Sequence, residues 1–166
     1  MGNIVFLHWI QIVLILILVY LAYIDLRTFR LPDVITLPLI LSGLLVSGFS
    51  NQGFVSFWDS AIGAILGYLS LWLLNSLYRF AKQHDGIGMG DAKLLAALGA
   101  WLGWFALPGI LLIASLTGLI GGLIWLQWNK QNHRSAFPFG PFLAIAGIIE
   151  LLWPQTLQTL LLSKLA

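Results

Sequence analysis

Residues 10–22 read IQIVLILILVYLA, an almost purely apolar run inside a longer first segment, 4–24. A helix that crosses a bilayer needs about 20 predominantly apolar residues, and this segment supplies them. The segment has no basic start, and the run leads to no small-residue cleavage site, so it does not fit a signal peptide. We therefore expect a retained membrane-spanning helix here.

The same character extends along the whole chain of 166 residues, of which 60% are apolar and 8% are charged. Soluble domains carry about 25% charged residues, so lipid is the solvent that suits this composition. We predict an all-α, polytopic membrane protein with about six transmembrane helices, forming a single membrane-embedded domain over 1–166. The second segment is marginal in length and the fourth is short. The predicted segments are 4–24, 34–50, 57–78, 92–106, 108–127 and 139–162.

Basic residues gather in alternate loops, while the loops near 51–56 and 106–108 have none. Because basic loops remain in the cytoplasm, this pattern predicts that the termini face outward. Lys164 alone lies on the outer side. The cytoplasmic set is Arg27, Arg30, Arg79, Lys82, Lys93, Lys130 and Arg134.

Small and aromatic residues are expected to pack the helices together and to anchor them in the membrane. Glycine pairs at four-residue spacing favour close helix packing. Tryptophans near the segment ends favour anchoring at the membrane interface. The glycine pairs are Gly63/Gly67, Gly99/Gly103 and Gly118/Gly122, and the tryptophans include Trp58, Trp101, Trp104, Trp125, Trp128 and Trp153.

Two acidic residues fall at the ends of predicted helices, Asp25 after the first and Asp91 before the fourth. Two membrane crossings separate them, so both lie at the same membrane face. Two carboxyl groups at one site suffice for peptide hydrolysis, one taking a proton from water and the other donating to the leaving amine. Simpler interpretations are that Asp91 caps its helix and that Asp25 pairs with Arg27 or Arg30.

The stretch DGIGMGDAKLL at 85–95 places three glycines before Asp91. Glycine permits close approach of another backbone, and a substrate peptide must be extended to be cleaved. A glycine-rich lead-in beside a carboxylate is therefore suited to holding a peptide.

The chain resembles the GxGD aspartyl proteases, and most closely the bacterial type IV prepilin peptidases. Four stretches carry the resemblance, and they occur in the family's order. They are IDLRTFRLPDVITLPLI at 24–40, DGIGMGD at 85–91, GMGDAKLLAALGAWLGW at 88–104 and FPFGPFLA at 137–144.

The resemblance implies that Asp25 and Asp91 are the catalytic pair. It also implies that Gly88, Gly90, Lys93 and Asp33 belong to the substrate site. The expected reaction is removal of the basic leader peptide from prepilins or pseudopilins, typically after glycine, at the cytoplasmic face of the bacterial inner membrane. Neither a metal nor a cofactor is expected, and the expected partners are the substrate and membrane lipid, with no nucleic acid.

Full-length members of that family usually carry an N-terminal domain with paired CxxC motifs, associated with N-methylation. This sequence contains no cysteine. We therefore expect the methyltransferase domain to be absent, and cleavage without N-methylation by this chain.

Other interpretations remain open for several residues. Asp33 competes with Asp25 as catalytic partner, but it also suits a helix N-cap. Ser56 and Asp59 suit a capping box. Glu150 has no assigned role.

A rival function is a transporter or channel in which Asp25, Asp91 and Glu150 line an ion or proton path. A serine protease built on Ser50 is a poor fit, because His84 and His133 lie on the opposite side. A non-catalytic assembly protein is disfavoured by the intact aspartates and glycines. His8, His84 and His133 do not form a metal-ligand pattern.

Overall fold

A computed structural model of the chain describes residues 2–49, 53–82, 88–128 and 138–154. These residues form helices joined by short connections, and no strand occurs among them, which confirms the all-α prediction. The helices are α1 (Gly2–Thr28), α2 (Asp33–Phe49), α3 (Phe57–Lys82), α4 (Met89–Leu102), the short 3₁₀ helix η1 (Trp104–Ala106), α5 (Leu107–Trp128) and α6 (Gly140–Leu152).

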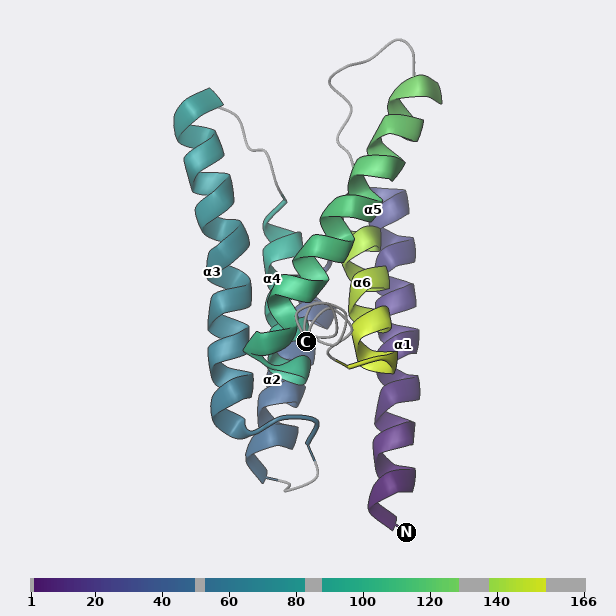
Figure 1. Cartoon of the computed structure of the whole chain (residues 1–166), viewed down its shortest axis with the longest axis vertical. Helices are drawn as coiled ribbons and strands as arrows, with labels where there is room; N and C mark the ends of the chain where they lie inside the picture. Colours follow the sequence, from purple (N-terminus) through teal and green to yellow (C-terminus); the bar gives the residue numbers. More distant parts are fainter. Residues whose placement is uncertain (1, 50–52, 83–87, 129–137, 155–166) are drawn as a thin grey trace, which may run out of the picture.

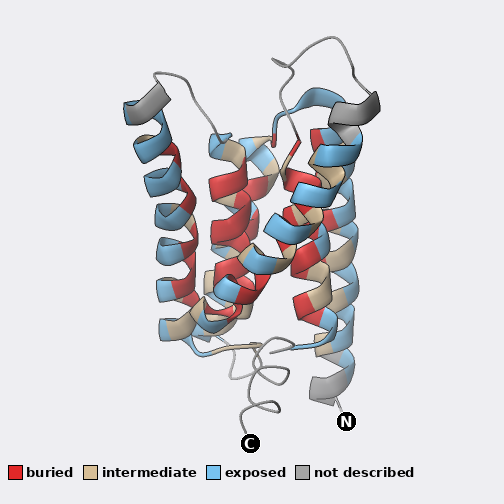
Figure 2. Cartoon of the chain, turned by 45° about the horizontal axis from the view of Figure 1, so that its top comes forward, coloured by how far each residue is buried: buried red, intermediate tan, exposed pale blue. Residues whose placement is uncertain are grey.

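The outer surface of the bundle is apolar. Among the described residues, three helical stretches are long and apolar enough to cross a membrane, Leu7–Thr28, Phe57–Phe80 and Trp104–Ile124, and α2 and α6 are shorter apolar helices. Buried positions face the inside of the bundle, while the exposed positions of α1, α3 and α5 face outward (Figure 2). Since many of the exposed side chains are large and apolar, a lipid environment suits this surface better than water. The polytopic membrane prediction is confirmed.

Helix α4 lies at the centre of the bundle. It packs against α2, α3 and α6, while α1 and α5 pack against α6 (Figure 1). Every residue from Leu94 to Trp101 is buried, and half of these are alanine or glycine. Small side chains let neighbouring helices approach α4 from several sides. The helix that begins with the GxGD glycines is therefore enclosed by the others.

Glycines allow α3 and α4 to approach closely, as their spacing predicts. A Cβ atom on Gly63 would collide with the carbonyl of Gly99, and one on Gly99 would collide with the carbonyl of Gly63. Next to this contact, Ser60 Oγ donates a hydrogen bond to the carbonyl of Ala100 at 2.5 Å. Gly67 meets the backbone of Leu95 one turn further along.

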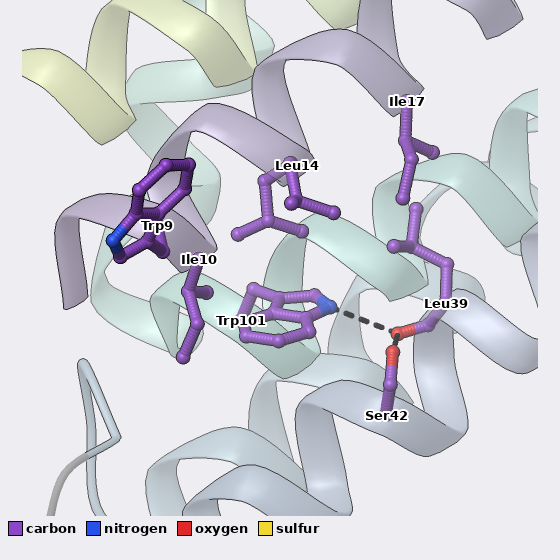
Figure 3. A pocket seen from close by; sticks show the side chains of 8 residues that line it. Trp9, Ile10, Leu14, Ile17, Leu39, Ser42 and Trp101 are labelled. Atoms are coloured by element: carbon purple, nitrogen blue, oxygen red, sulfur yellow. Dashed lines mark hydrogen bonds between the residues drawn. The ribbon is translucent and has the colours of Figure 1, made fainter. Parts of the chain in front are cut away.

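Trp101 does not anchor the membrane interface, so that expectation is wrong. Its side chain is buried, and its Nε1 donates a hydrogen bond to the carbonyl of Leu39 at 2.9 Å. The ring lies against a cavity of about 290 Å³ between α1, α2 and α4 (Figure 3). Trp58 and Trp153 are exposed near helix ends, as expected of interfacial side chains.

Ser56 caps the start of α3, where the sequence predicts a capping-box-like start. The Asp59 N–H donates to Ser56 Oγ at 3.2 Å, and Ser56 Oγ donates to Asp59 Oδ2 at 2.7 Å. Trp104 Nε1 also donates to Asp59 Oδ1, at 3.1 Å. Asp59 therefore stabilises the start of α3, at the end of the bundle opposite Asp91.

Segment boundaries differ from the sequence prediction by a few residues at several places, such as the ends of α1 at Thr28 and of α3 at Lys82, and more clearly at two. The fourth segment, predicted over 92–106, is broken at Gly103, which has a φ of +81° and separates α4 from η1. Helix α6 ends at Leu152, and residues 155–162 of the predicted sixth segment lie outside the described residues.

Candidate active site

Asp25 lies on α1, just before the helix ends, and its side chain is buried. The chain turns away directly afterwards, because Phe29 adopts a left-handed conformation (φ +53°) that non-glycine residues seldom take. The Phe29 N–H still donates to the carbonyl of Asp25 at 2.8 Å. Arg27 lies over the ring of Tyr23, 5.2 Å from its centroid. The Asp25 side chain instead accepts a hydrogen bond from Gly140.

Asp91 lies in the first turn of α4 and is also buried. Gly88 is the N-cap residue in an extended conformation, and no side chain caps this helix end. The Asp91 N–H donates to the Gly88 carbonyl at 3.1 Å. The capping interpretation of Asp91 is therefore wrong, and its carboxyl group is available for another role.

Helix α6 begins where these two carboxyl groups meet. The N–H of Gly140 donates a hydrogen bond to Asp25 Oδ2 at 3.1 Å. A Cβ atom built on Gly140 would stand 2.6 Å from Asp25 Oδ2 and 3.3 Å from Asp91 Oδ1. The two carboxyl oxygens are thus no farther apart than the sum of these distances. The structure brings Asp25 and Asp91 together at the same end of the bundle.

Lys93 and Asp33 pair with each other beside this site. Lys93 Nζ lies 2.6 Å from Asp33 Oδ1, joining α4 to α2. Asp33 is the first residue of α2, and the Pro32 carbonyl accepts the N–H groups of Ile35 and Thr36. The Asp33 side chain therefore forms an ion pair with Lys93 at the start of α2.

The two GxGD glycines have different surroundings. A Cβ atom on Gly90 would stand 2.9 Å from Leu31 Cβ, so the segment between α1 and α2 packs directly on the first turn of α4. A Cβ atom on Gly88 would meet only Asp91 Oδ2, at the ordinary distance of 3.6 Å. Gly88 is exposed and has space beside it, whereas the space at Gly90 is filled by the chain itself. Asp85–Ile87 lie outside the described residues.

Within the described residues, no group of three or more His, Asp or Glu side chains could hold a metal ion. Two neighbouring buried carboxyl groups can still perform acid–base chemistry, because close like charges resist ionising together and one group retains a proton.

The sequence did not assign Gly140 a role. The one signal for it was its place within FPFGPFLA.

Residues 12–123 match the sequence profile of the type IV leader peptidase family, a range that includes Asp25 and Asp91. The chain belongs to this family.

Curated relatives of this type IV leader peptidase family member carry the name prepilin leader peptidase/N-methyltransferase. The protein of Pectobacterium carotovorum is 46% identical over 145 residues, which are 87% of this chain and 51% of that protein. The protein of Aeromonas hydrophila is 48% identical over 141 residues, 85% of this chain and 48% of that protein. The chain thus spans about half the length of the curated relatives it matches. No solved structure matches it.

Proposed function

We propose that this chain is an aspartyl endopeptidase that removes the basic leader peptide from type IV prepilins or pseudopilins, typically after a glycine. The observation that carries the proposal is the convergence of two buried carboxyl groups, Asp25 and Asp91, on Gly140. The names of the relatives support the substrate class.

In the proposed reaction, one carboxylate takes a proton from water, and the water oxygen attacks the scissile carbonyl carbon. The other carboxyl group, protonated, donates a hydrogen bond to the carbonyl oxygen. It then gives its proton to the leaving amine as the C–N bond breaks. The exposed Gly88 would let the extended substrate backbone approach Asp91 closely. Lys93 and Asp33 would line the same region as an ion pair.

The proposed location of the site is the cytoplasmic face of the bacterial inner membrane. Arg27, Arg30, Arg79 and Lys93 lie toward the end of the bundle that holds Asp25 and Asp91. By the positive-inside rule this end faces the cytoplasm. Anionic lipid head groups there would attract a basic leader.

The transport alternative receives less support. Asp59 and Glu150 line a cavity of about 330 Å³ at the end of the bundle away from Asp25 and Asp91. A cluster of buried apolar side chains lies between the two ends, including Leu94, Leu98 and Leu143. An ion path would need polar groups along its length.

Cleavage of a prepilin with a basic leader and a Gly-Phe junction, by the purified chain in lipid, tests the proposal. We expect Asp25→Asn and Asp91→Asn each to lose at least about 1,000-fold in kcat/KM, because each removes a group that acts in the transition state. Mass spectrometry of the product identifies the cut bond and the state of the new N-terminus.

Two further carboxyl variants serve as controls. Asp33→Asn and Glu150→Gln remove acids outside the proposed pair, so both should retain activity within about tenfold. Loss of cleavage in Asp33→Asn with full activity in Asp25→Asn would transfer the catalytic role to Asp33. A folded wild-type chain that cleaves no prepilin would count against the proposed function.

A further inference from the structure

The backbone N–H groups in the first turn of α6 can be accounted for individually. Phe142 and Leu143 donate to the Phe139 carbonyl, at 3.1 and 3.2 Å. Pro141 has no N–H to donate. The Gly140 N–H donates to Asp25 Oδ2. A helix start leaves N–H groups that need partners from outside the helix, and here that partner is the carboxyl group of Asp25.

The start of α6 favours negative charge for a second reason. The aligned peptide dipoles of a helix place a partial positive charge at its N-terminus, and a hydrogen bond to a carboxylate is stronger than one to a neutral acid. Helix α6 has 13 residues, and no side chain of its own caps its start. Asp91 lies in the first turn of α4, where the dipole of its own helix also favours negative charge, but no backbone N–H at the start of α4 donates a hydrogen bond to its side chain. The hydrogen bond from Gly140 therefore distinguishes Asp25 from Asp91.

Position 140 also has no space for a side chain. The Cβ atom of any other residue would stand 2.6 Å from Asp25 Oδ2, closer than real Cβ contacts, and 3.3 Å from Asp91 Oδ1. The obstructing atoms belong to both carboxyl groups. Hence a single methyl group here would push the pair apart.

We propose that Gly140 is a positioning residue that holds Asp25 as the charged member of the carboxyl pair and leaves the space in which Asp91 approaches it. The assignment makes Asp25 the group that takes the proton from water and Asp91 the group that donates to the scissile carbonyl. The catalytic consequence rests on the proposed function, whereas the contact and the charge can be tested without any cleavage.

A double-mutant cycle on thermal stability in detergent tests the contact. We expect Gly140→Ala to lower the melting temperature by about 4 °C or more, the effect of overpacking in a chain of this size. In an Asp25→Ala background the obstructing carboxyl group is gone, so the same change should have a clearly smaller effect. An equal loss of melting temperature in both backgrounds would show that the Asp25 carboxyl group does not obstruct position 140, whether or not the chain is a peptidase.

The charge is tested by comparing two isosteric variants at neutral pH. Asp25→Asn removes a charge from the start of α6 and should lower the melting temperature, because the favourable interaction with the helix dipole is lost. Asp91→Asn replaces a neutral acid and should leave the melting temperature unchanged or raise it. The opposite order would overturn the assignment of charge to Asp25.

Kinetics test the positioning role. A methyl group between the carboxyl groups should reduce kcat by about 100-fold while KM stays within about threefold, since displacing catalytic groups by about 1 Å has effects of this size. Gly147→Ala is the matched control on α6, because its Cβ atom would stand 2.5 Å from Leu98 Cδ2, an equally close contact that involves neither carboxyl group. Equal kcat losses in Gly140→Ala and Gly147→Ala would indicate general helix packing and contradict the proposal.

Discussion

Lys93 Nζ and Asp33 Oδ1 lie 2.6 Å apart, and this ion pair joins the N-terminal parts of α4 and α2. Lys93 comes two residues after Asp91, and Asp33 follows the short segment that connects α2 to the helix of Asp25. The pair therefore links the two parts of the chain that carry the proposed catalytic groups.

Exchanging the two charges tests this link. Lys93 and Asp33 are partly exposed, so the pair should contribute only about 0–1 kcal/mol to stability. We expect Lys93→Ala to reduce kcat/KM by about fivefold, because the start of α4 loses its tie to α2. The double variant Lys93→Asp with Asp33→Lys should recover part of this loss in a cleavage assay. Absence of any recovery would favour a direct contact of Lys93 with substrate.

The two GxGD glycines should respond differently to alanine. In Gly90→Ala the new Cβ atom would meet Leu31 Cβ at 2.9 Å, so the segment before α2 must shift and the melting temperature should fall by roughly 2–6 °C. In Gly88→Ala the Cβ atom has ordinary space, so the melting temperature should hold while KM for prepilin rises. Paired thermal and kinetic measurements distinguish these effects. A Gly88→Ala protein with an unchanged KM would exclude close substrate approach at Gly88.

The contact between Gly63 and Gly99 should be among the most sensitive in the bundle. A methyl group on either glycine would collide with the backbone carbonyl of the other, and a helix backbone cannot rotate away as a side chain can. We expect Gly63→Ala to cost roughly 1–3 kcal/mol or more in thermal unfolding. Gly48→Ala is the control, because its Cβ atom would meet only the ring of Phe57. Similar losses in both variants would contradict the proposed backbone collision.

Replacing Trp101 with phenylalanine removes one buried hydrogen bond together with part of a buried ring. A six-membered aromatic ring remains, but the five-membered part of the indole and the bond from its Nε1 to the Leu39 carbonyl are lost. Ser42 Oγ still donates to that carbonyl at 3.0 Å, so it is not left unsatisfied. The lost bond should cost about 1 kcal/mol, and the smaller buried ring should add a cavity cost of about 1–2 kcal/mol. The exposed Trp58 serves as comparison, and Trp58→Phe should leave the melting temperature nearly unchanged. If the two variants lose equal stability, the buried packing and hydrogen bond of Trp101 contribute nothing specific.

Some features of the site and of the fold could be predicted because they depend only on chain order or on the spacing of neighbouring residues. Two crossings between Asp25 and Asp91 require both residues to lie at one end of the bundle. The spacing of Gly63 and Gly67 predicts a close helix contact, and the spacing of Ser56 and Asp59 predicts a cap, both from local geometry.

Other features depend on which helices pack together, and an apolar sequence gives little information about this. Helix α4 is apolar around its whole circumference, so no periodicity indicates that Trp101 points inward. Asp25 and Gly140 are separated by 115 residues and meet only because α1 packs on α6. The partner of Asp25 therefore could not be derived from the residues around it.

The short central helix has a consequence for how water reaches the reaction. Helix α4 has 14 residues and is roughly 21 Å long, less than the hydrocarbon thickness of about 30 Å. Helices α3 and α5 extend beyond its first turn at the Asp91 end (Figure 1). Asp91 is thus recessed below the ends of its neighbours. The proposed hydrolysis at Asp91 therefore needs water to enter between the helices from this end of the bundle.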